Sequence, residues 1–276
     1  NANVAVGKDA LKANTTADNN TAVGIDALTA NTTGHSNVAI GANALLTSTT
    51  RLGNTAVGFN AAKVTDTTGI VAVGYKAMEA NTTGYDAVAV GASSLLANTT
   101  GHSNTAVGFS ALAANTTGAD NTAVGNSALL ANTTGTRNTV VGVDSSNQIT
   151  SGSDNTAMGF DALTRCTTGV SNTCIGKDAG DNITNGGYNT CLGIDSGTNI
   201  TQGSAHVMVG DSTTASAENS QNEIVIGVGI AGVGSNSFTF GKASNRVSND
   251  FDTNASWTRS SDINKKTNIE NTDLGL

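Results

Sequence analysis

The sequence predicts an all-β chain folded as a parallel β-solenoid of about fourteen 17-residue coils. Three observations lead to this fold class. A glycine that closes segments such as Ala-Val-Gly recurs with a 17-residue period from Gly7 to Gly227, with one interval of 16 between Gly58 and Gly74. The 276 residues include 33 Gly and no Pro, and only 12% are charged. Each period also joins a short β-favouring segment to the turn-forming segment Asn-Thr-Thr-Gly.

The constancy of the period indicates how the units are arranged. Neighbouring repeats of a solenoid stack on one another, so an insertion in one repeat would displace every column of side chains. Helical repeats of about 34 to 47 residues need long amphipathic segments, which this sequence lacks. A 17-residue unit has room for at most two short strands and two turns. The absence of proline agrees, because a proline in an inner coil would remove a hydrogen bond between strands.

Two neighbouring columns of the predicted strand are apolar. The residue directly before the reference glycine is Val, Ile, Leu or Met, as at Val107, and the residue two before it is mostly Ala, as at Ala106. Successive strand residues point to opposite faces, so both faces need a cover. We expect a second strand of the same coil to cover one face with the leucines four residues after the glycine; they are Leu28, Leu45, Leu95, Leu112, Leu129 and Leu163.

The other face of the strand needs a cover from outside the coil, which predicts that chains associate. A coil of this size encloses a thin core, and at about 25 cal/mol per Å² its burial barely offsets the conformational entropy of ordering the coil. Sibling chains of a homo-oligomer would supply the missing contact. We expect the Val and Ile column to point into the coil and the Ala column to face the siblings.

The repeated segment Asn-Thr-Ala-Val-Gly, as at residues 104–108, resembles the head repeats of trimeric autotransporter adhesins over residues 1–230. The resemblance implies a left-handed parallel β-roll and a homotrimer in which three rolls pack about one axis. This 17-residue repeat is longer than the unit usual in those adhesins, so we expect different turns.

Beyond the repeats, the chain divides into a transition segment, residues 231–260, and a final segment, residues 261–276. The stretch SSDINKKTNI, at residues 260–269, resembles the opening of the intramolecular chaperone auto-processing domain of bacteriophage tail fibres and tailspikes. That resemblance implies a chaperone trimer that templates folding of the fibre and then cuts itself off. It makes Ser261 the reacting residue and Lys266 its activating base, with the scissile bond directly after Ser261.

The implied chemistry is that of a serine nucleophile with a lysine base. A hydroxyl is a weak nucleophile unless a base takes its proton, and a lysine does so when burial lowers its pKa. Asn264 and Lys265 stand where that family usually has Arg and Leu. Only ten residues follow Lys266, so we expect the chain to be a segment of a longer fibre protein with the chaperone after it.

Charge and composition limit the function classes. The formal net charge of −8 argues against nucleic acid or an anionic membrane as partner, and no apolar run is long enough to predict membrane insertion. Repeated columns offer few unlike groups, so we expect no catalysis on an outside substrate, no cofactor and no metal site. The leading hypothesis is a virion tail-fibre shaft that mediates attachment to a host cell-surface receptor, a glycan or a protein. The alternatives are a bacterial trimeric surface adhesin and an ice-binding solenoid with a threonine column three residues before the glycine.

Two asparagine patterns are interpreted as structural. The Asn-Thr-Thr tripeptides fit an N-glycosylation acceptor, but their recurrence at the repeat period favours turn geometry; they begin at Asn31, Asn81, Asn98, Asn115 and Asn132. The asparagines four residues before the glycine predict a hydrogen-bonded amide ladder; they include Asn20, Asn37, Asn54, Asn104, Asn121, Asn138, Asn155 and Asn172.

The cysteines and histidines are also assigned structural roles. Cys174 and Cys191 are one period apart and are expected to stack as small buried residues, because parallel side chains meet disulfide geometry poorly. Cys166 receives the same interpretation. Symmetry copies of a histidine could bind an ion on a trimer axis, but ordinary surface or ladder residues are the favoured interpretation of the histidines; they are His35, His102 and His206.

Overall fold

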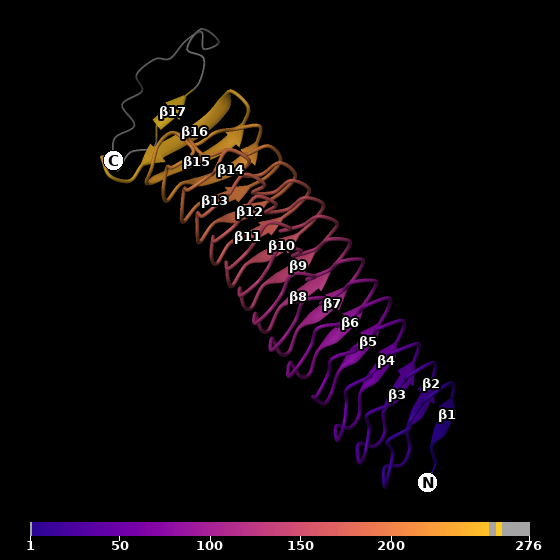
Figure 1. The fold of residues 1–276 in the computed structure, drawn as a ribbon. Helices are drawn as coiled ribbons and strands as arrows, with labels where there is room; N and C mark the ends of the chain where they lie inside the picture. Colours follow the sequence, from indigo (N-terminus) through magenta and orange to yellow (C-terminus); the bar gives the residue numbers. More distant parts are fainter. Residues whose placement is uncertain (1, 254–257, 261–276) are drawn as a thin grey trace, which may run out of the picture.

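The structure, a computed structural model, describes residues 2–253 and 258–260 as an elongated all-β rod (Figure 1). Fourteen strands follow one another along the rod, and three more end it. The strands are β1 (Val4–Val6), β2 (Thr21–Val23), β3 (Val38–Ile40), β4 (Thr55–Val57), β5 (Val71–Val73), β6 (Val88–Val90), β7 (Thr105–Val107), β8 (Thr122–Val124), β9 (Thr139–Val141), β10 (Thr156–Met158), β11 (Thr173–Ile175), β12 (Thr190–Leu192), β13 (Val207–Val209), β14 (Ile224–Val228), β15 (Ser237–Lys242), β16 (Asn245–Asp250) and β17 (Thr258–Ser260). None of the described residues is helical.

The first fourteen strands form one parallel stack. Each strand pairs with the next at a shift of one repeat, so that Thr105 lies opposite Thr122. Where the interval shortens to 16, between β4 and β5, Thr55 lies opposite Val71 and the pairing continues. The prediction of a parallel β-solenoid with a 17-residue repeat is therefore confirmed.

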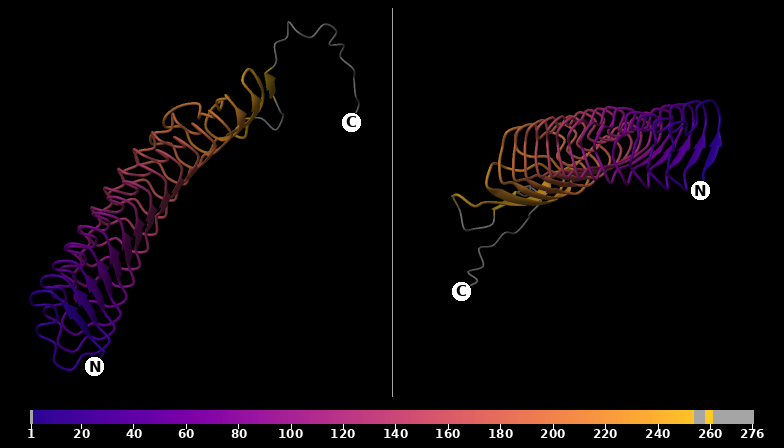
Figure 2. Two further views of the ribbon diagram at one scale, coloured as in Figure 1. Left: turned by 90° about the vertical axis from the view of Figure 1, so that its right-hand side faces the viewer. Right: turned by 60° about the horizontal axis from the view of Figure 1, so that its bottom comes forward.

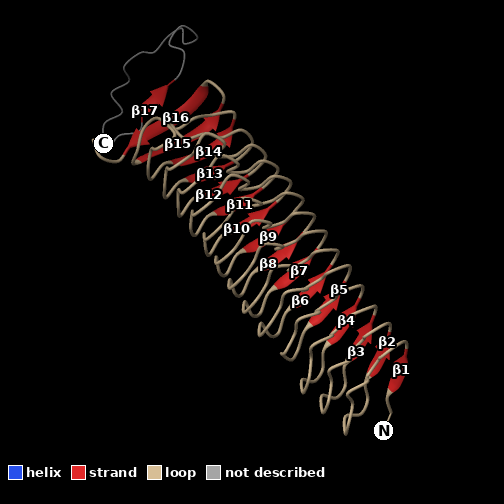
Figure 3. Cartoon of the chain, viewed as in Figure 1, coloured by secondary structure: helices blue, strands red, loops and turns tan. Residues whose placement is uncertain are grey.

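Each coil contains one strand, and the expectation of a second strand around the leucine column is wrong. Figure 3 shows the strands along one side of the rod and turns around the rest. Leu112 has a φ of 54° and Leu129 a φ of 53°, both in the left-handed region. A residue in that region bends the chain and cannot continue a strand. The leucine column is therefore a corner of the coil.

Neighbouring coils hold these corners in place. Ser110 has a φ of 53° and donates its backbone N–H to the carbonyl of Ala92 at 2.9 Å, in the coil before. Leu112 donates its N–H to the carbonyl of Ala128 at 3.0 Å, in the coil after. Since left-handed residues other than glycine are unfavourable on their own, a corner of this kind is stable only within the stack.

The reference glycine is required by the close approach of neighbouring coils. Gly108 has a φ of 138°, which other residues rarely adopt, and a Cβ atom there would lie 2.3 Å from the carbonyl oxygen of Gly125. Gly125 makes the same approach to the carbonyl oxygen of Gly142. A larger residue would force the coils apart, which explains why glycine recurs at every repeat.

The alanine column points into the coil, and the Val and Ile column points outward. Ala106 and Leu112 are fully buried and belong to the same core. By contrast, Ile40 is 39% exposed and Met158 is 42% exposed. The expectation that the Val and Ile column fills the coil, with alanine facing the siblings, is therefore wrong. A corner rather than a second strand closes the coil, so the interior is narrow, and an alanine with a leucine fills it.

Within a coil, the sizes of two core side chains compensate for one another. Half of the fourteen coils combine an inward alanine of the strand with a leucine at the corner. In the coil of β9 these positions hold Val140 and Ser146, and in the coil of β11 they hold Cys174 and Gly180. A Cβ atom at Gly180 would lie 2.6 Å from the Sγ atom of Cys174. The inward strand residue is therefore larger only where the corner residue is smaller.

The stack ends in a different arrangement at its C-terminal end. β14 pairs with β15 in parallel, with Ile224 opposite Phe238, so the last coil is shorter than the 17-residue coils before it. β16 then pairs with β15 in the antiparallel direction, and β17 pairs with β16 in the same way. Figure 2 shows this terminal sheet at one end of the rod, continuous with the stacked strands. The chain changes here from stacked coils to a hairpin.

Candidate functional site: the outward face of the sheet

The outward side of the sheet carries an apolar band along the rod. It is formed by two positions in each coil, the residue directly before the reference glycine and the residue directly after it. We call this surface the apolar band. Thirteen of its apolar side chains are 39–57% exposed; they are Val6, Ile25, Ile40, Phe59, Tyr75, Phe109, Val143, Met158, Phe160, Ile175, Ile194, Ile226 and Val228. The first of these columns is the one predicted to be apolar; the second was not predicted, and its apolar residues are interrupted by Lys8, Asn126, Lys177 and Asp211.

The apolar band is larger than the apolar patches of ordinary monomers. The four aromatic side chains bury roughly 150–250 Å² each when fully covered, so at half exposure they leave on the order of 400 Å². The nine aliphatic side chains bury about 60–120 Å² each when fully covered and leave a similar area, so the total is on the order of 800 Å². The largest patch on a typical monomer is about 300–600 Å². A standard stable interface covers about 800 Å² on each partner. The band is therefore large enough to serve as an interface.

Aromatic residues of neighbouring coils stack within the apolar band. The ring centroids of Phe59 and Tyr75 lie 5.7 Å apart, with an angle of 13° between the ring planes. The Nζ atom of Lys76 lies 5.7 Å from the centroid of the Tyr75 ring. Phe59 and Tyr75 therefore form one aromatic surface across two neighbouring coils.

The asparagine ladder predicted four residues before the glycine is confirmed inside the rod. Asn138 donates its backbone N–H (3.0 Å) and its side-chain Nδ2 (3.1 Å) to Oδ1 of Asn121, and Nδ2 also donates to the carbonyl of Gly152 (2.9 Å). Its own Oδ1 accepts the same pair of bonds from Asn155. These asparagines are fully buried. The ladder satisfies backbone groups in each coil and ties that coil to the next.

A second buried ladder, which the sequence analysis missed, is formed by the Asn-Thr-Thr segments. Nδ2 of Asn115 donates to Oδ1 of Asn98 at 2.7 Å and to the carbonyl of Gly118 at 2.9 Å. The hydroxyl of Thr116 donates to the carbonyl of Thr133 at 3.0 Å. The five candidate glycosylation acceptors are all fully buried, which confirms their interpretation as turn residues; they are Asn31, Asn81, Asn98, Asn115 and Asn132.

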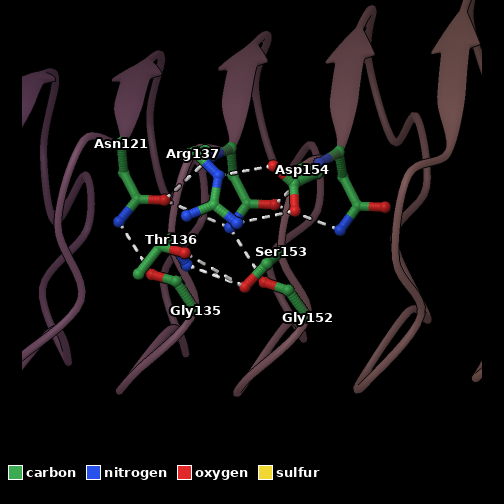
Figure 4. Close-up of polar contacts among 9 residues, drawn as sticks. Asn121, Gly135, Thr136, Arg137, Gly152, Ser153 and Asp154 are labelled. Carbon is green, nitrogen blue, oxygen red and sulfur yellow. Dashed lines mark hydrogen bonds and ion pairs between the residues drawn. The ribbon is translucent and has the colours of Figure 1, made fainter.

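The turn beside the first ladder carries a surface ion pair. Figure 4 shows Arg137 and Asp154 side by side on adjacent coils, with Nε to Oδ1 at 2.6 Å and Nη2 to Oδ2 at 2.9 Å. The neighbouring backbone N–H of Thr136 donates to Oγ of Ser153 at 3.0 Å. The hydrogen bond from Arg137 lowers the pKa of Asp154. Since both side chains are exposed, water screens the pair and it adds little to stability.

The three cysteines are buried and free, as expected. Cys174 and Cys191 lie opposite each other on β11 and β12. The hydrogen bond with Cys191, together with burial, raises the pKa of the Cys174 thiol. Burial raises the pKa of Cys166 to about 11. Thiols with raised pKa values are poor nucleophiles, so these residues act as core side chains.

The histidines occupy surface and ladder positions. His35 is exposed on a turn. His102 lies in the same turn column and stacks on Tyr85, with ring centroids 4.9 Å apart. His206 is fully buried, and its backbone N–H donates to Oδ1 of Asn189 at 3.1 Å, as an asparagine would at that rung.

Reactive groups do not converge in the part of the chain that the structure describes. Among residues 2–253 and 258–260, no three His, Cys, Asp or Glu side chains are placed to hold a metal ion. Within the same ranges, no helix has the length and apolar character needed to cross a bilayer. Ser261 and Lys266, the expected autoprocessing pair, lie outside the described residues.

Comparison with known proteins adds no relative: no family profile, curated protein sequence or solved structure matches the chain. The function must therefore be inferred from the residues of the chain itself. The feature of the described rod that most needs a functional explanation is the apolar band.

Proposed function

We propose that the chain is a structural shaft segment of a virion tail fibre, and that three copies pack through the apolar band. The band is the observation that supports this proposal, since apolar surface of this extent is typical of a face that a partner covers. The partner is another copy, because the band repeats along the rod with the period of the coils. Identical rods side by side match it coil for coil.

The interior of the rod suits a shaft. Stacked strands, two amide ladders and a threonine hydroxyl ladder connect neighbouring coils at several points around the circumference. Each connection repeats along the rod, so the rod gains stiffness without a site at which unlike groups meet. The proposed role is therefore mechanical, and it involves no catalysis on an outside substrate.

The number of copies and the virion setting are supported by the two sequence resemblances. The Asn-Thr-Ala-Val-Gly repeats favour a trimer, and the SSDINKKTNI stretch favours a tail fibre trimerised by a self-cleaving chaperone. In this proposal Ser261 and Lys266 take part in a single cut of their own chain. The receptor on the host cell surface is a glycan or a protein, and a net charge of −8 disfavours nucleic acid as a partner.

Sedimentation equilibrium of the whole chain at micromolar concentration tests the association. We expect a mass three times that of one chain. Phe109→Lys and Met158→Lys place a charge within the apolar band, and burying that charge between rods costs several kcal/mol, so both variants should sediment as monomers. Tyr188→Lys is the matched control, because Tyr188 is 67% exposed but lies on a turn outside the band.

Several outcomes would contradict the proposal. A stable monomer for the unchanged chain would remove the role of the apolar band, and a trimer in all the lysine variants would place the contact elsewhere. The virion setting has its own test, in which antibodies against the rod are located by electron microscopy. Labelling of virion tails supports a tail fibre, whereas labelling of a bacterial surface supports the adhesin.

A further inference from the structure

His206 occupies the ladder position at which neighbouring coils have asparagine, and its imidazole makes two of the bonds that the asparagine amide makes. In Asn189, Nδ2 donates to the carbonyl of Gly203 at 3.0 Å and Oδ1 accepts from the backbone N–H of His206 at 3.1 Å. In His206, Nε2 bonds the carbonyl of Ser220 at 2.8 Å and Nδ1 bonds the backbone N–H of Glu223 at 3.3 Å. The ring therefore reproduces two of the three side-chain bonds of a ladder asparagine; the third, from Nδ2 of Asn189 to Oδ1 of Asn172 at 3.0 Å, belongs to the amide.

These two partners allow one form of the ring. The carbonyl of Ser220 can only accept, so Nε2 carries the hydrogen, and the N–H of Glu223 can only donate, so Nδ1 is bare. The ring is thus neutral in the ladder. A proton added to Nδ1 would point at the N–H of Glu223 and break that bond. An asparagine at this rung has no such limit, because its amide does not titrate.

The surroundings of the ring also favour the neutral form. His206 is fully buried, and burial lowers its pKa, while the charge of Glu223 on the next coil opposes this effect. The Glu223 carboxylate is itself held by Ser216, through the backbone N–H at 3.0 Å and the hydroxyl at 2.5 Å. On the coil before, Asn189 meets the ring with an uncharged amide, and the side chain of Glu218 on the adjoining turn is exposed.

We propose that His206 is an acid-sensitive latch at the C-terminal end of the rod, whose protonation opens β13 and β14 while the asparagine-bonded coils stay closed. In the unfolded chain the imidazole has a pKa of about 6.5, and in the folded rod the pKa of His206 is lower. Between the pKa of the folded ring and that of the unfolded ring, the unfolded chain binds more protons than the folded chain. The stability that the neutral ring contributes is therefore full above about pH 6.5, decreases as the pH falls between the two pKa values, and is lost below the pKa of the folded ring. Because β15 pairs with β14, opening also frees the terminal hairpin.

Amide hydrogen exchange of the whole chain between pH 7.5 and 4.5, corrected for the intrinsic pH dependence of exchange, tests the latch. Peptides that cover residues 207–228 should lose protection on acidification. The expected change is about tenfold for each unit by which the pKa of His206 lies below 6.5. Peptides that cover residues 105–141 should keep their protection. Equal loss of protection along the whole rod, or no loss at residues 207–228, would overturn the proposal.

Three variants separate His206 from its neighbours. His206→Asn restores the ladder residue and should abolish the acid response at residues 207–228. His102→Asn removes a half-buried histidine outside the ladder and should leave the response unchanged. Glu223→Gln removes the nearby carboxylate and should also leave a response. If His206→Asn responds to acid like the unchanged chain, the latch assignment is wrong.

A measurement on the unchanged chain does not depend on how the variants fold. Nitrogen-15 NMR of the imidazoles reports the tautomer and the pKa of each ring. We expect His206 to be protonated on Nε2 alone at pH 7 and to gain its second proton only below pH 6.5. A hydrogen on Nδ1 at pH 7, or a doubly protonated ring at pH 6.5, would refute the proposal.

Discussion

Removal of one rung of the first asparagine ladder should destabilise the rod locally and strongly. Asn138→Ala deletes the acceptor for the backbone N–H of Asn155, 3.0 Å away, and the donor to the carbonyl of Gly152, 2.9 Å away. Asn138 and Asn155 are fully buried, so water does not replace these bonds. An unsatisfied buried polar group costs about 1–3 kcal/mol, and the two together predict a loss of about 2–6 kcal/mol.

Hydrogen exchange measures this loss where it occurs. A loss of about 2 kcal/mol corresponds to roughly 30-fold faster exchange, and we expect it in peptides that contain β9 and β10 rather than in β2 and β3. Asn185→Ala is the control, because Asn185 is exposed on a turn and its removal should change stability by about 0.5 kcal/mol or less. Equal effects of the two substitutions would refute the view that the ladder stabilises the stack.

Three further predictions follow from the interior and from the ladders. Ala123→Val overpacks the core and Leu129→Ser leaves a cavity, so each substitution alone should cost about 1–5 kcal/mol of stability. A triple variant that carries both substitutions together with Asn132→Ile should recover much of the melting temperature that each single variant loses. Burial, and then the charges of Asp178 and Asp144, raise the pKa of Asp161, so Asp161→Asn should stabilise the rod at pH 7 and lose that advantage in acid. Asn189→His together with His206→Asn should move the acid response, measured by hydrogen exchange, one coil toward the N-terminus.

The period and the strand register could be predicted from the sequence because both depend only on the spacing of residues along the chain. A glycine that must approach the next coil, as Gly108 approaches Gly125, is required in every repeat and sets the spacing. Once the spacing is fixed, parallel pairing brings like residues into columns. The first asparagine ladder follows directly, because a polar column inside a stack must bond to itself.

The direction of the side chains could not be predicted from apolar character alone. A three-residue strand with Ala106 and Val107 is apolar on both faces, so periodicity does not distinguish inside from outside. The leucine column suggested a strand because leucine is rare in the left-handed region that Leu112 adopts. Only the stacking of coils stabilises that corner, and stacking is not visible in the residues of one coil.

The sequence does contain a signal for the direction of the strand side chains, namely pairs of residues whose sizes compensate for one another. Val140 occurs with Ser146 and Cys174 with Gly180, whereas the usual pair is alanine with leucine. Two columns that compensate for one another's size must face the same space. The column before the glycine changes from Val to Met158 or Leu192 without any such compensation, as expected for residues that face outward.

The variation within the apolar band also distinguishes the proposed functions. An ice surface repeats, so a protein that binds it needs the same side chain at every rung. The position after the glycine instead varies from Lys8 to Phe59 and Lys177, and the threonine column beside the band is interrupted at Val38 and at other rungs. An interface between identical rods tolerates this variation, because each coil meets the same coil of its neighbour. We therefore expect no thermal hysteresis from the rod, and a clear hysteresis gap in a nanolitre osmometer would favour the ice-binding alternative over association through the apolar band.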